Sequence, residues 1–170
     1  MTSMRRLSPV WRLMRACDLP AVMRLAGRIH PGLPEDETVF AERLDLFPEG
    51  CRVLDTGESV AGYALAHPIR YPHPPSLDTL IGAIPPEADA FYIHDVAIGP
   101  EARGGGHAGA IVEAFLDIAD GFPRACLISV YGTAPFWRRF GFVEAADQVS
   151  PKKLAAYGED ARFMVRVMQD

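Results

Sequence analysis

The stretch Phe91-Tyr-Ile-His-Asp-Val-Ala-Ile98, followed by Gly99-Pro-Glu-Ala-Arg-Gly-Gly-Gly-His-Ala-Gly109, decides the interpretation of this chain. Its first half has the apolar composition of a buried strand, which Gly99 and Pro100 end. Behind the glycines, apolar residues recur at helical spacing and predict an amphipathic helix: Ala108, Ile111, Val112, Phe115, Ile118 and Ala119. A strand, a glycine-rich turn and a helix therefore follow one another here.

The glycine turn has the chemistry of an anion-binding site. The first N–H groups of a helix lack acceptors within the helix and lie at the positive end of its dipole. Glycines let the backbone approach an anion closely and adopt positive φ angles. Three consecutive glycines, Gly104–Gly106, therefore predict a phosphate site in preference to a simple connector.

Two common nucleotide motifs do not fit this turn. Gly104-x-Gly106-x-x-Gly109 matches the dinucleotide fingerprint in its letters, but residues 99–102 separate the glycines from the strand. No Asp or Glu stands between Asp120 and Glu144, where the fingerprint needs an acid for the ribose. A P-loop is excluded because no Gly-Lys-Ser/Thr closes the turn.

Outward from this stretch, the chain predicts one α/β domain over residues 1–170, with a frayed tail at 1–8. Further strands are expected at Val10–Arg15, Cys51–Asp55, Val60–His67, Ala125–Val130, Phe142–Ala146 and Arg162–Met168, the last closing the sheet at its edge. Further helices are expected after Asp18, whose carboxylate would cap the first, and at Glu37–Phe47 and Ala134–Phe140. The segment 68–90 holds six prolines, and a loop of this length predicts the lining of a site.

Composition narrows the class of protein. The 170 residues carry 17 basic and 22 acidic side chains, a formal charge of −5, which argues against a nucleic-acid binder. Three widely spaced cysteines form neither a disulfide framework nor a metal motif, so we expect no metal and a cytoplasmic location. No apolar run approaches a membrane span, and we expect no membrane partner.

Written as Arg103-x-x-Gly106-x-Ala108, the turn resembles the acyl-CoA motif R/Q-x-x-G-x-G/A of the GNAT acetyltransferase superfamily. The segment Ala134-Pro-Phe-Trp-Arg-Arg-Phe-Gly-Phe142 is similar to that family's A-x-x-F-Y-x-x-x-G-F. The motifs cover about residues 91–146, and the order of predicted elements also agrees. The resemblance implies a mixed, twisted sheet of six to seven strands flanked by about four helices, with splayed fourth and fifth strands.

The same resemblance implies an N-acetyltransferase that moves the acetyl group of acetyl-CoA to a primary amine of a small molecule or protein. Attack would be direct, in a ternary complex, and family members are often dimers, so a homodimer is a possible state. The pantetheine would lie along the fourth strand, the pyrophosphate on the glycine turn, and aromatic rings beside them. The implied cofactor residues are Val96, Ala97, Ile98, Arg103, Gly104, Gly105, Gly106, His107, Ala108, Gly109, Phe136 and Trp137.

Acetyl transfer to an amine needs a proton acceptor. An amine with a pKa of ~10.4 is deprotonated about once in 2,500 at pH 7, a penalty of roughly 4.6 kcal/mol. His94 is the preferred base, since a histidine of the matching strand lines the active site in the arylalkylamine acetyltransferases of this superfamily; a hydrogen-bonded structural histidine is the alternative. Strand alternation would place Asp95 on the opposite face, which argues against a direct pair with His94. The N–H of Val96 could meet the oxyanion.

One position departs from the family pattern. Trp137 stands where many members carry a tyrosine that protonates the departing thiolate, and an indole N–H cannot do this. Tyr131 is a candidate substitute, and a non-catalytic acyl-CoA-binding module is the alternative function. The walls of the acceptor site are expected from the first two helices and the 68–90 loop. His30, Glu35, Asp36 and Glu37 would attract a cationic amine there, or the acidic cluster belongs to a solvated face. Tyr71 and His73 could contact the amine from the loop.

Overall fold

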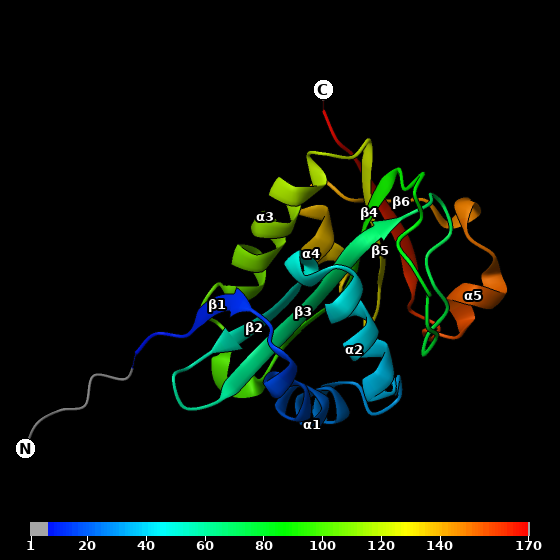
Figure 1. Cartoon of the computed structure of the whole chain (residues 1–170). Helices are drawn as coiled ribbons and strands as arrows, with labels where there is room; N and C mark the ends of the chain where they lie inside the picture. Colours follow the sequence, from blue (N-terminus) through cyan, green and yellow to red (C-terminus); the bar gives the residue numbers. More distant parts are fainter. Residues whose placement is uncertain (1–6, 170) are drawn as a thin grey trace, which may run out of the picture.

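The computed structural model describes residues 7–169, and within them a mixed sheet runs in the order β1-β2-β3-β4-β5-β7-β6 (Figure 1). The pair β4–β5 is parallel and all others are antiparallel. This confirms the mixed sheet expected from the sequence. The strands are β1 (Val10–Leu13), β2 (Cys51–Asp55), β3 (Val60–Ile69), β4 (Ala90–Ile98), β5 (Arg124–Ser129), β6 (Val143–Glu144) and β7 (Arg162–Val167).

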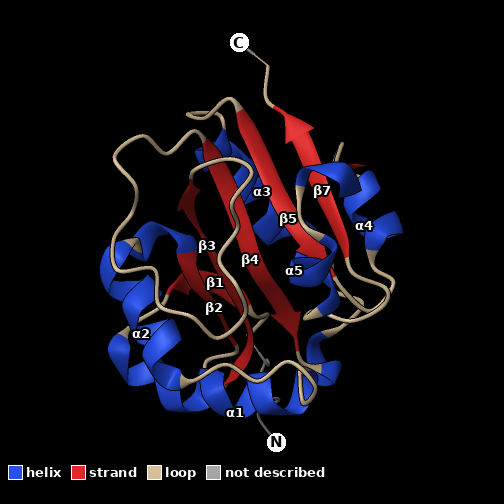
Figure 2. Ribbon diagram, turned by 90° about the vertical axis from the view of Figure 1, so that its right-hand side faces the viewer, coloured by secondary structure: helices blue, strands red, loops and turns tan. Residues whose placement is uncertain are grey.

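Helices cover both faces of this sheet (Figures 1 and 2). Helix α3 (His107–Ala119) and helix α4 (Ala134–Arg138) pack on one face, where Phe115 and Trp137 join a core that includes Phe91. Helix α1 (Leu19–Ile29) and helix α2 (Glu37–Leu46) cover the other face over Tyr63. A short helix, α5 (Pro151–Ala155), was not predicted and lies beside a third core cluster around Phe163.

The strands β4 and β5 separate part-way along their length. Their parallel pairing begins at Ala90–Arg124 and ends at Ile93–Leu127, although β4 continues to Ile98 and β5 continues to pair with β7. The predicted splay of the fourth and fifth strands is therefore confirmed. It leaves the second half of β4 with a free edge, which any ligand in the gap can reach.

A β-bulge in β4 coincides with the start of this gap. Ala66 of β3 pairs with Ile93, whereas the preceding residue of β3, Leu65, pairs with Asp95. His94 therefore has no partner in β3 and is the extra residue of the bulge. A bulge of this kind puts two successive side chains on the same face of a strand. His94 and Asp95 both contact groups on the face covered by α1 and α2.

Three features differ from the sequence prediction. Strand β7 lies inside the sheet because the two-residue strand β6 pairs beyond it and forms the edge. The loop begins at residue 70 and not at 68, because Pro68 still pairs with Phe91 of β4. Strand β2 does not extend to this part of β3, so the missing N–H of Pro68 leaves no acceptor unpaired on that side. Asp18 does not cap α1; its carboxylate accepts from Arg12 and from the N–H of Arg15 instead.

The predicted tail at 1–8 falls mostly outside the described residues, and its last two, residues 7 and 8, lie in neither helix nor strand. Within the described chain, no helix is both long enough and apolar enough to cross a membrane.

Candidate active site

The glycine turn presents unpaired backbone N–H groups in front of α3. Gly104 and Gly106 adopt φ angles of +83° and +76°, which side-chain-bearing residues rarely adopt. Within the described structure, the N–H groups of Gly104, Gly105 and Gly106 have no acceptor. Arg103 donates from Nε to the carbonyl of Ile98 at 3.1 Å and so ties the turn to the end of β4. These glycine N–H groups are free to donate to an anion.

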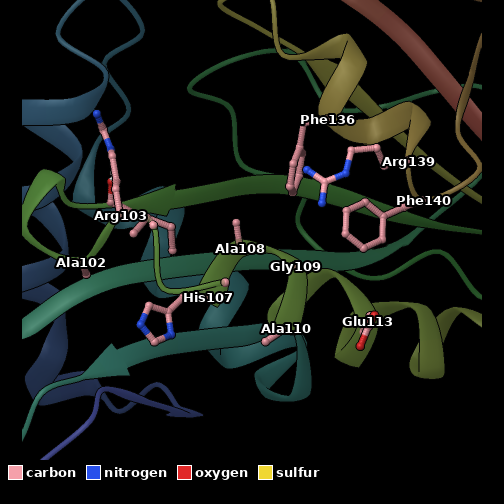
Figure 3. A pocket seen from close by; sticks show the side chains of 13 residues that line it. Ala102, Arg103, His107, Ala108, Gly109, Ala110, Glu113, Phe136, Arg139 and Phe140 are labelled. Carbon is pink, nitrogen blue, oxygen red and sulfur yellow. Dashed lines mark hydrogen bonds between the residues drawn. The ribbon is translucent and has the colours of Figure 1, made fainter.

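An open cavity of about 580 Å³, which we call the outer cavity, lies over this turn (Figure 3). Eight of the predicted cofactor residues line it: Ile98, Arg103, Gly104, Gly106, His107, Ala108, Gly109 and Phe136. Gly105 is not among its lining residues. Arg139 and Phe140, which follow α4 and face α3 across the cavity, were not predicted. Only their place in the Ala134–Phe142 segment could have indicated them.

A second cavity of about 400 Å³, the inner cavity, occupies the gap between β4 and β5. It shares Ile98, Arg103, Ala108 and Phe136 with the outer cavity, so the two are adjacent. Three further residues predicted to bind the cofactor, Val96, Ala97 and Trp137, also line it. Trp137 is at the same time part of the core, with 7% of its surface exposed.

The free edge of β4 directs hydrogen-bonding groups into the inner cavity. The N–H of Gly99 donates to Ala61 of β3 at 2.7 Å. Because N–H groups alternate in direction along a strand, those of Ala97 and Asp95 also point to β3, and those of Ile98 and Val96 point into the gap. An extended ligand in the gap could therefore pair with β4 as another strand would.

Four side chains form a hydrogen-bonded chain at the inner end of this cavity. Asp95 Oδ1 lies 3.0 Å from Nε2 of His30, and Asp95 Oδ2 accepts from the hydroxyl of Tyr63 at 2.6 Å. The other ring nitrogen of His30, Nδ1, lies 3.2 Å from the hydroxyl of Tyr131, and the two rings are stacked. Tyr131 stands at a φ of +54° just after β5 and is 55% exposed.

The predicted base, His94, also lines the inner cavity, but it is hydrogen-bonded in a separate buried pair. Its Nε2 lies 2.6 Å from Oε1 of Glu35, and only 2% of the His94 side chain and 7% of the Glu35 side chain are exposed. Burial works to raise the pKa of Glu35, but the hydrogen bond and charge of His94 outweigh it and lower this pKa below its ordinary value. His94 and Asp95 share no hydrogen bond, as predicted, but the reason given from alternation is wrong, because the bulge puts both on one face.

A third cavity of about 270 Å³, the α1–α2 cavity, lies on the far side of His30. Its walls are largely apolar and include Met23, Leu33 and Phe40, with the polar groups of Tyr63, Glu35 and Asp95. Within the described part of the chain, neither Lys nor Arg lines it. His30 and Asp95 line both this cavity and the inner cavity, so they stand at the boundary between the two.

Comparison with protein families assigns this architecture. The model of the Acetyltransferase (GNAT) family matches residues 19–142. The chain belongs to the GNAT family. GNAT proteins are acyl-CoA-dependent acetyltransferases, and the match extends from α1 through the glycine turn to the end of the Ala134–Phe142 segment. A comparison with curated proteins gives no match.

Solved GNAT structures share the fold at low sequence identity. Ard1 from Thermoplasma volcanium is 18% identical with a TM-score of 0.67, and the alignment covers 96% of this chain and 100% of Ard1. The loading GNATL domain of CurA from Lyngbya majuscula is 13% identical with a TM-score of 0.79 over 94% of this chain and 97% of that domain. N-acetylglutamate synthase from Neisseria gonorrhoeae, complexed with coenzyme A and N-acetyl-glutamate, is 19% identical with a TM-score of 0.70 over 95% and 35% of the two chains.

Proposed function

We propose that this GNAT protein transfers the acetyl group of acetyl-CoA directly to a primary amine of a small molecule or a protein. The observation that carries this proposal is the continuity of the two cavities. The outer cavity offers unpaired N–H groups of three glycines to a pyrophosphate, and the inner cavity leads from there along the free edge of β4 to a cluster of ionisable side chains. A phosphate-bearing thioester fits this sequence of surfaces.

The free edge of β4 supplies the electrostatic part of the mechanism. The pantetheine amides would pair with Val96 and Ile98, and the N–H of Val96 would face the thioester carbonyl. A fixed backbone donor aimed at a developing oxyanion contributes about 3–4 kcal/mol when it is excluded from water. Attack by the amine nitrogen forms the C–N bond, and collapse of the tetrahedral intermediate breaks the C–S bond.

The acyl donor is the first thing to test. Acetyl-CoA and CoA are expected to raise the melting temperature of the protein, whereas NAD(P) is expected to leave it unchanged; a ligand at 100 times its Kd adds ~2.7 kcal/mol of stability. A melting temperature raised by NAD(P) and not by CoA would contradict the proposal.

Turnover is the second test. Acetyl-CoA is incubated with L-leucinamide, tyramine, spermidine and a short peptide with a free amino terminus, and the acetylated amines are measured by mass spectrometry. Mass detection is preferable to a thiol reagent, because Cys17 is exposed and would itself react. Tight CoA binding without acetylation of any of these amines would favour the non-catalytic acyl-CoA-binding module.

A further inference from the structure

We propose that His30, oriented by Asp95 and reached through the hydroxyl of Tyr131, takes the proton of the acceptor amine and returns it to the sulfur of CoA. This inference rests on the proposed acetyltransferase function and names the residues that would move its proton. The sequence favours His94 as the base and indicates His30 only for its charge. The structure gives the two histidines different partners.

The hydrogen bonds of His30 settle which ring nitrogen is basic. Asp95 accepts a hydrogen bond from Tyr63, and its pKa lies below the ordinary value. Burial works to raise this pKa, but the hydrogen bond and charge of His30 and the hydrogen bond from the Tyr63 hydroxyl together outweigh burial. An ionised carboxylate can only accept, so Nε2 of His30 must carry a proton toward Asp95. In the neutral ring Nδ1 is then the acceptor, and the Tyr131 hydroxyl donates to it across 3.2 Å. Nδ1 is therefore the basic atom, and it faces the open side of the site.

The position of His30 between two cavities also supports its assignment as the base. His30 and Asp95 line the inner cavity, which is proposed to hold the thioester, and the α1–α2 cavity, which has no described cationic wall. Tyr131 also lines the inner cavity and is 55% exposed, so an entering amine can reach it. His94 also lines the inner cavity, but only 2% of its side chain is exposed, against 12% for His30, and its Nε2 is occupied by Glu35.

The proton can be followed through the whole reaction. An ammonium group first loses one proton through Tyr131 and His30 to solvent. As the neutral amine attacks, one N–H proton passes to the Tyr131 oxygen while Tyr131 gives its own proton to His30 Nδ1. The resulting imidazolium faces the Asp95 carboxylate. When the C–S bond breaks, the same path runs in reverse, and Tyr131 delivers the proton to the thiolate. Amine and thioester thus yield amide and thiol, with Tyr131 and His30 restored.

The charged surroundings of His30 favour this cycle. The ring of His30 is faced by four groups: Asp95 of β4, Glu35 of the α1–α2 connection, Tyr63 of β3 and Tyr131 after β5. His94 lies behind Asp95 and Glu35. Burial of the ring works to lower the pKa of His30, but the hydrogen bond to Asp95 and the charges of Asp95 and Glu35 raise it above its ordinary value. Burial and the charge of Asp95 raise the pKa of Tyr131, which therefore stays protonated near neutral pH. The path also explains how the thiolate is protonated when Trp137 replaces the usual tyrosine, because Tyr131 supplies the proton.

The proton path from Tyr131 to His30 and Asp95, which we call the relay, is tested first without any substrate. The chain has five histidines, so NMR titration of the full-length protein, labelled at histidine, can be assigned with single substitutions. We expect His30 in the Nε2–H tautomer when neutral, with a pKa above the ordinary value of histidine, and a lower pKa in Asp95→Asn. A His30 signal in the Nδ1–H tautomer, or one with a pKa that is not raised and does not respond to Asp95→Asn, overturns the assignment.

The second test measures turnover of the amine that the wild-type protein acetylates best. We expect His30→Gln to lower kcat/KM by about 10²–10⁴-fold and to abolish the acidic limb of its pH profile, while stabilisation by CoA is retained. Tyr131→Phe should lower kcat, Asp95→Asn should move the acidic limb to lower pH, and the matched control His73→Asn should keep the wild-type profile. The limb should persist in His94→Gln.

The outcomes separate this inference from the proposed function. If wild-type protein acetylates an amine and His30→Gln keeps its kcat/KM and acidic limb, or if His94→Gln loses that limb, the relay is wrong and the acetyltransferase proposal stands. If wild-type protein binds CoA and acetylates no amine, the proposed function fails, and the NMR titration still decides the pairing of His30 with Asp95 and Tyr131. Retained stabilisation by CoA shows that each variant is folded.

Discussion

Glu35 and His94 form a buried pair, 2.6 Å from Oε1 to Nε2, that joins the α1–α2 connection to the bulge of β4. The second oxygen of Glu35 accepts from the N–H of Asp78 at 3.0 Å. One carboxylate thus connects β4 to the loop at 70–89, which crosses the front of β4 between α2 and α5 (Figure 2). Glu42 accepts from Ile81 and Gly82 and holds the same loop farther along α2. We infer that Glu35 has a structural role in addition to any effect on charge.

Glu35→Gln is therefore expected to destabilise the protein by about 1–3 kcal/mol at pH 7, because it removes the charge from a buried, hydrogen-bonded pair. The pKa of Glu35 is lower in the folded protein than its ordinary value, so its stabilising contribution is present above the ordinary value and is lost as the pH falls through the folded one. The difference between wild type and variant in urea denaturation should shrink from pH 7 to pH 3.5. Glu58→Gln, on an exposed hairpin turn, is the control, and a pH-independent difference would contradict this account.

Gly106 and Gly82 provide a matched pair for testing the anion site. Their φ angles are +76° and +78°, and an added Cβ would contact nothing within 4 Å at either position. Alanine should therefore cost about 1 kcal/mol of stability at both, through backbone strain alone. Gly106→Ala should also weaken CoA binding by about 5–30-fold, or about 1–2 kcal/mol, whereas Gly82→Ala should not. Calorimetric titration with CoA measures this, and equal affinities in the two variants would argue against a cofactor at the turn.

How much of this site could be predicted depends on the range of the interactions. The strand, the glycine turn and the helix of residues 91–119 are adjacent in the sequence, and their composition alone identified them. The splay of β4 and β5 followed from the family resemblance, since no local residue pattern encodes it. The bulge at His94 has no glycine or proline to indicate it, because a bulge depends on the register with β3. Simple alternation therefore placed Asp95 on the wrong face.

The hydrogen-bonded chain was hidden for a related reason. His30 and Tyr131 are 101 residues apart, and His30 and Asp95 are 65 apart, so that only the fold brings them together. The sequence indicates these two residues separately, His30 for its charge and Tyr131 as a candidate acid. The pairing could not be predicted, because it depends on where the α1–α2 connection lies over the gap between β4 and β5. Arg139 was missed because it lies between the aromatic residues that drew attention to its segment.

Arg139 and Arg138 offer a direct test of the outer cavity. Arg139 lines this cavity beside Phe136 and Phe140, whereas Arg138 forms an exposed ion pair with Glu144 and does not line it. Arg139→Gln is expected to weaken CoA binding by about 3–10-fold, the size typical of an exposed charge pair, and Arg138→Gln should leave it unchanged. The loss should become smaller at 0.5 M salt, because ions screen exposed charges. If both substitutions weaken CoA binding equally, only the overall charge of the protein contributes to binding, and not the place of Arg139 in the outer cavity.

The acceptor site is expected between the first two helices, and the walls of the α1–α2 cavity found there predict which amines are acceptors. Glu35 and Asp95 are its ionised groups, and no Lys or Arg lines it within the described chain, so a cationic amine is attracted and a neighbouring carboxylate is repelled. At about 6 Å and an effective dielectric constant near 20, each such repulsion amounts to about 3 kcal/mol. L-leucinamide should therefore be acetylated with a kcat/KM at least ~30-fold above that of L-leucine, and tyramine should likewise exceed L-tyrosine. Glu35→Gln should narrow both ratios, whereas Glu58→Gln should not. Comparable rates for the amide and the free acid in wild-type protein would mean that the acceptor binds elsewhere.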